Sequence, residues 1–404
     1  MTRRWAQAGW GGGIWAVLMV ALVLPLPFRA VPFPERGVPI VFILLAGAIC
    51  LFGRVARVSL PLGLLMVYLL GTTLVGGGDR RGLELLLLLT FAGALFVEAA
   101  GMGQRWARRV AWALLLAVAS QGILGVLNLW GVFPSPYLMT KPFHWLGVPY
   151  EVIDGLFGGR IPLRSSELYR AAGWLTHPNY WGSYIALGVA PAYWLLGWSG
   201  GVLVLVLAGA SVSVGPVVSA SAAFFAMAWY DPRWPRRLRA VTAAALVLMA
   251  VSLAGLHVWS LHEWPEYTNP EHLLSGRGAV WAAGVEFGME KPWFGHGLGA
   301  WRRWAEHYNR MTQSAFATSQ AHNEPVQAFV EFGAVGLALL AAALVLTLRA
   351  MRRGFRGPEA VWAGVLVAAL VNSLGSPTWH LPAQGAVTVF ALGRVLGAEA
   401  QGGS

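Results

Sequence analysis

The sequence predicts an all-α polytopic membrane protein with about twelve transmembrane helices and two long loops on the outer face of the membrane. Hydrophobic residues make up 57% of the 404 residues. Charged residues are only 12%, about half of the ~25% typical of a soluble globular protein. Apolar runs long enough to cross a bilayer recur along the chain. These features exclude a soluble enzyme, a disordered chain and a disulfide scaffold. The single cysteine, Cys50, predicts neither a disulfide nor a thiolate metal cluster.

A spanning helix needs ~20 largely apolar residues. The candidate spans are 11–28, 37–53, 58–75, 82–101, 110–130, 179–197, 201–214, 216–230, 240–259, 328–348, 359–375 and 379–397. The first span follows two arginines and resembles an uncleaved signal anchor. The seventh and eighth are short, and Gly215-Pro216 separates them. They form either a tight hairpin or one broken helix.

The arginines orient these spans, because short cytoplasmic loops of membrane proteins carry an excess of positive charge. With the N-terminus in the cytoplasm, sixteen arginines fall in cytoplasmic segments and four in short outer loops. Both termini are then cytoplasmic. The net charge of +11 therefore reflects topology, and we expect no nucleic-acid partner. The predicted organisation is N-terminal spans (1–130), a first outer loop (131–178), central spans (179–259), a second outer loop (260–327) and C-terminal spans (328–404).

The two long outer loops hold the nine remaining basic residues and most of the histidines. Long loops inside a compact protein are uncommon and usually functional. In the second loop, apolar residues at helical spacing predict an amphipathic helix over 277–290 that lies on the outer interface. Pro292 and the glycines at 295, 297 and 299 predict a turn after it.

Several motifs follow one another along the outer loops. Arg170, Gly173, His177, Pro178 and Asn179 precede a span. Ser275-Gly276-Arg277, then Pro292-Trp-Phe-Gly-His-Gly297, precede His322-Asn323, which is followed by nine residues, Gly333, two residues and Gly336. In this order, on one face, they resemble the O-antigen ligase and O-antigen polymerase superfamily, which includes bacterial protein O-oligosaccharyltransferases. The resemblance covers about residues 165–345 by motif and the whole chain by topology.

The resemblance implies a glycosyltransferase of the bacterial cytoplasmic (inner) membrane with its active site on the periplasmic face. The donor would be a glycan on undecaprenyl diphosphate, and the acceptor a hydroxyl of a glycan, of lipid A-core or of a protein. It implies no cofactor and no metal. One departure concerns a Ser-Arg pair that relatives often carry after the Pro-Asn segment. The comparable stretch here, 211–216, has no arginine, so another arginine would have to replace it.

His322 is the predicted general base, because imidazole has the pKa best matched to accepting a hydroxyl proton near neutral pH. Arg277 is the first predicted diphosphate ligand, since guanidinium donors match phosphate oxygens. Attack opposite the diphosphate would invert the anomeric centre. Interfacial lipid contacts for Arg277 and a structural hydrogen bond for His322 are the alternatives.

Other residues are weaker candidates. Arg302, Arg303 and Arg170 are further predicted diphosphate ligands, with snorkelling to the interface as the alternative for the first two. Asn323 either orients His322 or caps a helix. Glu331 would need a partner within its span, and it either orients an arginine or the histidine or sits near the interface. Asn179 is a supporting residue.

Other functions remain open from the sequence. A polymerase would use the same donor, extend a lipid-linked repeat and could need a chain-length regulator. A protein O-oligosaccharyltransferase often carries a further soluble domain, and the chain ends soon after its last span. A transporter or flippase of lipid-linked glycans would place charges inside several spans and show a repeat. The middles of most spans here are apolar, which favours the enzyme, and the motif slightly favours a ligase.

Overall fold

The computed structural model describes residues 92–129, 178–240, 277–312, 321–376 and 382–402, apart from the single residues 94, 97, 98, 212, 236, 238 and 239. The predicted spans 11–28, 37–53 and 58–75, and most of 82–101 and 240–259, lie outside the described residues. So do the predicted first outer loop, except for its last residue, and residues 260–276 and 313–320 of the predicted second outer loop. The described part of the chain consists of helices and turns, as predicted.

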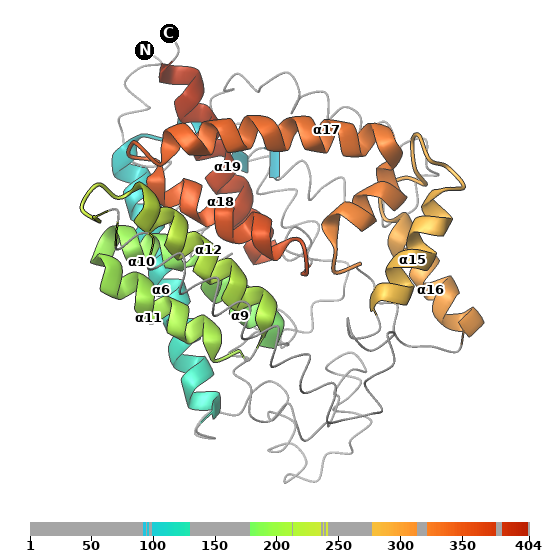
Figure 1. Ribbon diagram of the computed structural model, residues 1–404, viewed down its shortest axis with the longest axis horizontal. Coiled ribbons are helices and arrows are strands. Elements are labelled where there is room, and N and C mark those ends of the chain that lie inside the picture. Colours follow the sequence, from blue (N-terminus) through green and yellow to red (C-terminus); the bar gives the residue numbers. More distant parts are fainter. Residues whose placement is uncertain are drawn as a thin grey trace, which may run out of the picture.

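The described helices form a bundle with a smaller helical pair beside it (Figure 1). The bundle contains α6 (Gln104–Leu129), α9 (Pro178–Leu187), α10 (Val189–Leu196), α11 (Trp198–Gly209), α12 (Val214–Tyr230), α18 (Ala360–Asn372) and α19 (Pro382–Gly402). The pair is α15 (Arg277–Gly288) and α16 (Ala300–Thr312). The long helix α17 (Glu324–Gly354) packs on both groups and so connects them.

Two described helices are long and apolar enough to cross a membrane, Gln104–Leu127 and Glu324–Gly354. The apolar helices Trp198–Gly209, Ala360–Asn372 and Gln384–Ala398 are shorter. These helices overlap predicted spans, with ends that differ by up to six residues. The total of twelve spans stays a prediction.

The predicted span 179–197 is divided into α9 and α10 at Gly188. Pro191 explains the break, because proline has no N–H to donate to the carbonyl four residues earlier, at Leu187, and its ring clashes with that carbonyl. Gly188 also lies against α6, where a Cβ would come 2.5 Å from a methyl group of Val118. The division therefore coincides with a close helix contact.

The seventh and eighth predicted spans form a hairpin of α11 and α12, which decides between the two alternatives. Gly201, near the start of α11, contacts the ring of Phe224, near the end of α12. The helices are therefore antiparallel, and residues 210–213 join them. Ser213 precedes α12 in an extended conformation (φ −133°, ψ 127°), which ends the helical run before Gly215-Pro216.

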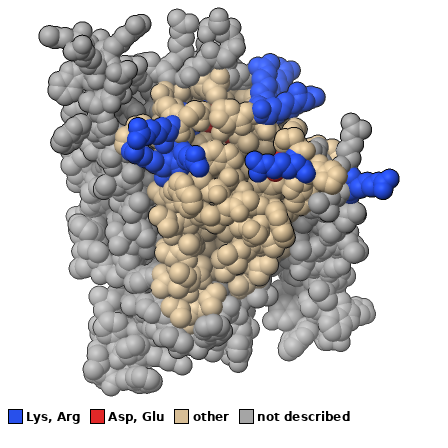
Figure 2. Space-filling model, turned by 90° about the vertical axis from the view of Figure 1, so that its left-hand side faces the viewer, with Lys and Arg blue, Asp and Glu red and all other residues tan. Residues whose placement is uncertain are grey.

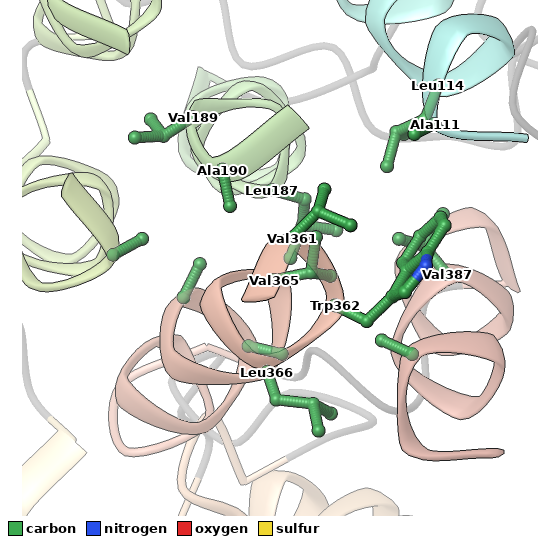
Figure 3. Packing of buried hydrophobic residues seen from close by; sticks show 14 of the residues in the cluster. Ala111, Leu114, Leu187, Val189, Ala190, Val361, Trp362, Val365, Leu366 and Val387 are labelled. Atoms are coloured by element: carbon green, nitrogen blue, oxygen red, sulfur yellow. The ribbon is translucent and has the colours of Figure 1, made fainter. Parts of the chain in front are cut away.

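The core of the bundle is built around α18 (Figure 3). Val361 and Val365 are buried on the side of α18 that faces α9 and α10, and Leu366 is buried on another side of the helix. Trp362 points towards α19, where it packs edge-on against Phe390 at 4.8 Å between ring centroids. Apolar side chains around a whole helix are typical of a helix enclosed by others. α18 is therefore the central helix of the described bundle.

Arginine-rich segments gather at one end of the bundle, which we call the arginine-rich end. The arginines lie at the start of α6, just after α12 and at the end of α17, and the end of α10 and the start of α18 lie with them. Tyr193 of α10 donates a hydrogen bond to Asp231 (3.0 Å), and Tyr230 of α12 stacks on Phe355 beyond α17 (4.7 Å). Figure 2 shows Lys and Arg in a band across one face, with a mostly uncharged surface below. This clustering agrees with the arginine pattern used to predict the cytoplasmic side.

Arg394, one of those arginines, does not lie in solvent. It is 3% exposed and pairs with the buried carboxylate of Glu359, with 3.2 Å between Nε and Oε2. Gln104 donates to the same carboxylate, and Arg394 donates to the carbonyl of Ala99 at 3.0 Å. The pair thus connects the starts of α18 and α6 to α19.

Candidate functional site

The helix α17 is broken at Gly333, the first glycine of the His-Asn motif. Gly333 has φ 63° and ψ −164°, far from helical values. Such a break leaves backbone carbonyls before it and N–H groups after it without partners inside the helix. Figure 1 shows α17 turning sharply at its end beside α15. The short part, 324–332, carries the motif, and the long part continues to Gly354.

The backbone of residues 292–297, which we call the 292–297 loop, fills the break in α17. Each of its four hydrogen bonds pairs a backbone group of the loop with one beside Gly333. The N–H groups of His296 and Gly297 donate to the carbonyls of Val330 (3.0 Å) and Glu331 (2.9 Å), and the carbonyls of Pro292 and Trp293 accept from Ala334 (2.7 Å) and Val335 (3.1 Å). The loop therefore satisfies the backbone groups that the break exposes.

Glycine is required on both sides of this contact. A Cβ at Gly333 would lie 2.5 Å from the carbonyl carbon of Trp293 and 2.7 Å from the nitrogen of Gly295. A Cβ at Gly295 would lie 2.5 Å from the backbone of Glu331. Both glycines also have positive φ, 67° at Gly295 and 63° at Gly333, where other residues are strained. The Pro-Trp-Phe-Gly stretch and the first motif glycine are thus two halves of one backbone contact.

The amphipathic helix lies elsewhere than predicted. Residues 277–288 are helical, as expected, but polar and apolar residues are not separated onto two faces of α15, and Val285 is 38% exposed. The strongly two-faced helix is α16, where Trp301 is buried against Gly284 and Arg302 is exposed. The prediction was wrong because it relied on the spacing of apolar residues in 277–290. The charged residues of 300–312, which lie on one side of α16, are the stronger sign of an amphipathic helix.

His322 has a left-handed backbone, with φ 55°. Among the described residues other than glycine it is alone in this respect. A non-glycine residue there is uncommon and stores local strain of about 1–3 kcal/mol. The imidazole is half-buried and stacks on Tyr180 of α9, with ring centroids 6.4 Å apart and 14° between the planes. Strain at a half-buried histidine inside a motif marks a candidate catalytic residue.

Asn323 caps α17. Its Oδ1 accepts a hydrogen bond from the N–H of Val326 at 3.1 Å, and its backbone is extended (φ −153°, ψ 102°). An N-cap asparagine satisfies one of the first N–H groups of a helix. The structure thus shows the capping role that the sequence left as one of two alternatives. The cap determines where α17 begins and so where His322 stands.

Glu331 is buried, at 2% exposure, in the short part of α17. Gln327, one turn earlier, donates from Nε2 to its carboxylate at 3.2 Å and accepts at Oε1 from the N–H of Ala321 at 3.0 Å. Glu331 is therefore connected through Gln327 to the residue before His322. We did not predict Gln327, although its i,i+4 spacing from a buried acid was the available signal.

The start of α9, the end of α18 and the start of α19 complete this region, which we call the His322 end. Gln384 of α19 donates to the carbonyl of Tyr180 at 2.9 Å, and the N–H of Glu324 donates to the carbonyl of Ser373 at 3.1 Å. Asn179, a predicted supporting residue, is the half-buried neighbour of Tyr180. The Pro-Asn segment and the His-Asn segment, far apart in sequence, thus meet. Sequence reasoning missed Tyr180 and Gln384, because only packing brings them together.

The His322 end is opposite the arginine-rich end. Both ends are connected by α18, which begins beside Glu359 and ends beside Ser373. Its 13 residues span about 20 Å at 1.5 Å per residue. This separation is what the predicted topology requires of a cytoplasmic side and an outer active site, although the membrane orientation itself stays a prediction.

The structure describes fewer contacts for the arginines predicted as diphosphate ligands. Arg277 begins α15, and its side chain lies outside the described residues, as does the whole of Arg170. Arg302 is half-exposed and pairs with Glu306 one turn later (3.3 Å). Arg303 is its neighbour on α16. Their roles as phosphate ligands stay predictions.

Two other features of the site have structural explanations. His296 donates from Nε2 to the carbonyl of Phe287 at 2.8 Å and stacks on that ring at 3.9 Å, so it holds the 292–297 loop on α15. Ser211 is fully buried against Gly182, where a Cβ would lie 2.5 Å from its Oγ. This crowding leaves no room for a larger side chain at 211.

Within the described ranges, no three His, Cys, Asp or Glu side chains gather where a metal could bind. Residues 181–341 match the family model described as O-antigen ligase. A comparison with curated proteins gives no significant match. The matched segment is less than half of the chain and includes both the 292–297 loop and His322. Residues 181–341 are therefore similar to the O-antigen ligase family, and this match supports a relation to the superfamily of membrane glycosyltransferases that the motifs resemble.

Proposed function

We propose that this protein transfers a glycan from undecaprenyl diphosphate to an acceptor hydroxyl at the outer face of the cytoplasmic membrane, as an O-antigen ligase does. His322 would be the general base and Arg277 the principal diphosphate ligand. Arg302, Arg303 and Arg170 would be further cationic candidates. The reaction would invert the anomeric centre and need no metal.

This proposal rests on the helix ends that meet around His322. Tyr180 at the start of α9, the cap of α17 and the end of α18 all lie around one strained histidine. Backbone strain of this kind concentrates at functional sites, where the surrounding structure holds it. The 292–297 loop holds the other end of the short motif helix. His322 is therefore fixed from both sides.

The chemistry suits this arrangement. The acceptor oxygen attacks the anomeric carbon, its proton passes to a ring nitrogen of His322, and the bond from that carbon to the diphosphate oxygen breaks. A hydroxyl is a weak nucleophile without a base, and imidazole accepts a proton near neutral pH. The departing diphosphate is an anion that needs positive charge more than a proton, and guanidinium groups supply that charge in a fixed geometry.

A transfer assay with purified protein tests the base. Detergent-solubilised protein receives lipid-linked glycan and candidate acceptors in the presence of a chelator. His322→Asn is the informative variant, because asparagine tolerates a left-handed backbone but cannot act as a base at neutral pH. We expect at least a 100-fold loss, in line with the ~10²–10⁴-fold contribution of general bases. His307→Ala, on the exposed side of α16, is the matched control and should retain activity.

Full activity of His322→Asn would overturn the base assignment. Arg277→Ala should raise the donor KM, and an unchanged donor KM would remove that arginine from the site. The product identifies the acceptor class. Glycan on lipid A-core supports a ligase, long chains on the lipid carrier mean a polymerase, and glycan on protein means an oligosaccharyltransferase. Absence of transfer in every combination would refute the proposed function.

A further inference from the structure

We infer that Gln384 of α19 and Ser376, just past the end of α18, form a subsite that binds a hydroxyl group of the glycan beside His322. The inference rests on the proposed function and names a part of that site. Both residues lie beyond the family match, which ends at residue 341. They would therefore contribute to substrate selection from a part of the chain that the matched segment does not include.

The first observation is an unmet hydrogen-bonding capacity in the protein interior. Gln384 is 2% exposed and Ser376 is 5% exposed. Gln384 Oε1 and Ser376 Oγ have no hydrogen-bond partner in the described structure. Buried polar atoms are nearly always paired, because an unpaired one loses its hydration without replacement. Two such atoms near one candidate site require a cause.

The second observation is how firmly Gln384 is held. Its amide nitrogen donates to the carbonyl of Tyr180 at 2.9 Å, and the ring of Tyr180 stacks on His322. One half of the amide is thus used to position the residue that contacts the candidate base. The other half, Oε1, stays available for a ligand.

Ser376 reaches the same region by a separate route. It lies three residues after Ser373, whose carbonyl accepts from the N–H of Glu324 at 3.1 Å. Glu324 is the first residue of α17 and lies two residues after His322. Gln384 is thus held at Tyr180 by its own hydrogen bond, and Ser376 lies three residues past the hydrogen bond that joins the end of α18 to the start of α17.

The chemistry of the two atoms limits the ligand. An amide oxygen accepts hydrogen bonds and donates none, and a serine hydroxyl does both. A diphosphate offers acceptors only, so Gln384 Oε1 cannot bind it. A sugar hydroxyl donates and accepts, and can pair with both atoms. The ligand group is therefore a glycan hydroxyl, which belongs either to the transferred glycan or to the acceptor.

The test is steady-state transfer with donor and acceptor concentrations varied separately. Ser376→Ala removes one unpartnered hydroxyl with little change in volume. Loss of one neutral hydrogen bond should raise one KM by about 2- to 10-fold. The kcat should change less than 2-fold, and the melting temperature should be equal or higher because a buried polar atom is gone. A raised donor KM places the subsite on the transferred glycan, and a raised acceptor KM places it on the acceptor.

Ser221→Ala is the matched control, because Ser221 Oγ is also buried without a partner in the described structure. It lies six residues along α12 from Gly215, whose Cβ position is 4.0 Å from Asn372. Ser221 therefore lies about 9 Å further from the His322 end than Gly215 does. We expect neither the donor KM nor the acceptor KM of Ser221→Ala to change. Gln384→Met, of similar length, should raise the same KM as Ser376→Ala and also lower kcat through Tyr180.

Wild-type activity with both KM values unchanged in Ser376→Ala and Gln384→Met overturns the subsite and leaves the proposed function standing. A KM change in Ser221→Ala as large as in Ser376→Ala also overturns it, because the effect would then follow loss of any buried hydroxyl. Lack of activity in the wild-type protein with every donor and acceptor overturns both proposals.

Discussion

Replacing Gly333 with alanine should separate the 292–297 loop from α17. The added Cβ would lie 2.5 Å from the carbonyl carbon of Trp293, a distance that no relaxed structure accepts, and the obstruction is backbone rather than a flexible side chain. Either α17 straightens or the loop moves away. In both cases the four backbone hydrogen bonds across the break are lost or weakened.

The size of the effect follows from two contributions. A non-glycine residue in this backbone region costs about 1–3 kcal/mol. Each backbone hydrogen bond contributes about 0.5–1.5 kcal/mol net. With four bonds at risk, Gly333→Ala should lower the free energy of unfolding by about 3–9 kcal/mol. Transfer activity should fall as well, because the short motif helix that follows His322 loses its support.

Thermal unfolding of the detergent-purified protein, followed by tryptophan fluorescence, measures this effect. Gly209→Ala is the matched control, since no atom lies within 4 Å of its Cβ position and its φ is not positive. That variant should unfold at or above the wild-type temperature, because alanine favours helix. Gly295→Ala should resemble Gly333→Ala, and the double variant should be less destabilised than the sum.

A melting temperature of Gly333→Ala equal to that of Gly209→Ala would refute the interlocked arrangement of the loop and α17. Additive effects of the two site glycines would show that they do not meet across one contact. After either result, the steric contact with the 292–297 loop would no longer explain why the motif has a glycine at 333.

Two further predictions concern the cap and the buried ion pair. Asn323→Ala should destabilise the protein by about 1 kcal/mol and Asn323→Asp should restore the stability, because aspartate caps equally well; equal melting temperatures of the two variants would exclude the cap. Arg394→Met should lower the free energy of unfolding by about 3–5 kcal/mol, because the carboxylate of Glu359 is left buried without its charge partner. Adding Glu359→Leu should restore most of the lost stability. A double variant as unstable as Arg394→Met alone would show that the loss does not come from the unpaired carboxylate.

The sequence predicted the described spans closely where the signal was local. Apolar runs anticipated α12 and α18 within about three residues, and α6 and α17 with ends up to six residues away, because burial in lipid or protein depends on each segment's own composition. The break at Gly188 could have been predicted from Pro191. The amphipathic helix was misplaced onto 277–290, since charged residues, more than apolar spacing, distinguish α16.

The candidate site was predictable in part. His322, Asn323 and Asn179 belong to motifs, and the structure places all three at the His322 end. Tyr180 and Gln384 carry no motif that could have been recognised. Their roles depend on contacts between α9, α17 and α19, and side-chain partners from distant segments cannot be inferred from spacing along one segment.

By itself the sequence determined the all-helical class of the described chain and the clustering of many of its arginines in segments apart from the histidine motif. Both follow from composition, because hydrophobic burial and the placement of charge act on each segment separately. Only the tertiary structure decided that Gly333 breaks α17 and that the 292–297 loop fills the break. Backbone hydrogen bonds across such a break depend on which segments pack together, and every buried N–H and carbonyl needs a partner wherever the chain provides one.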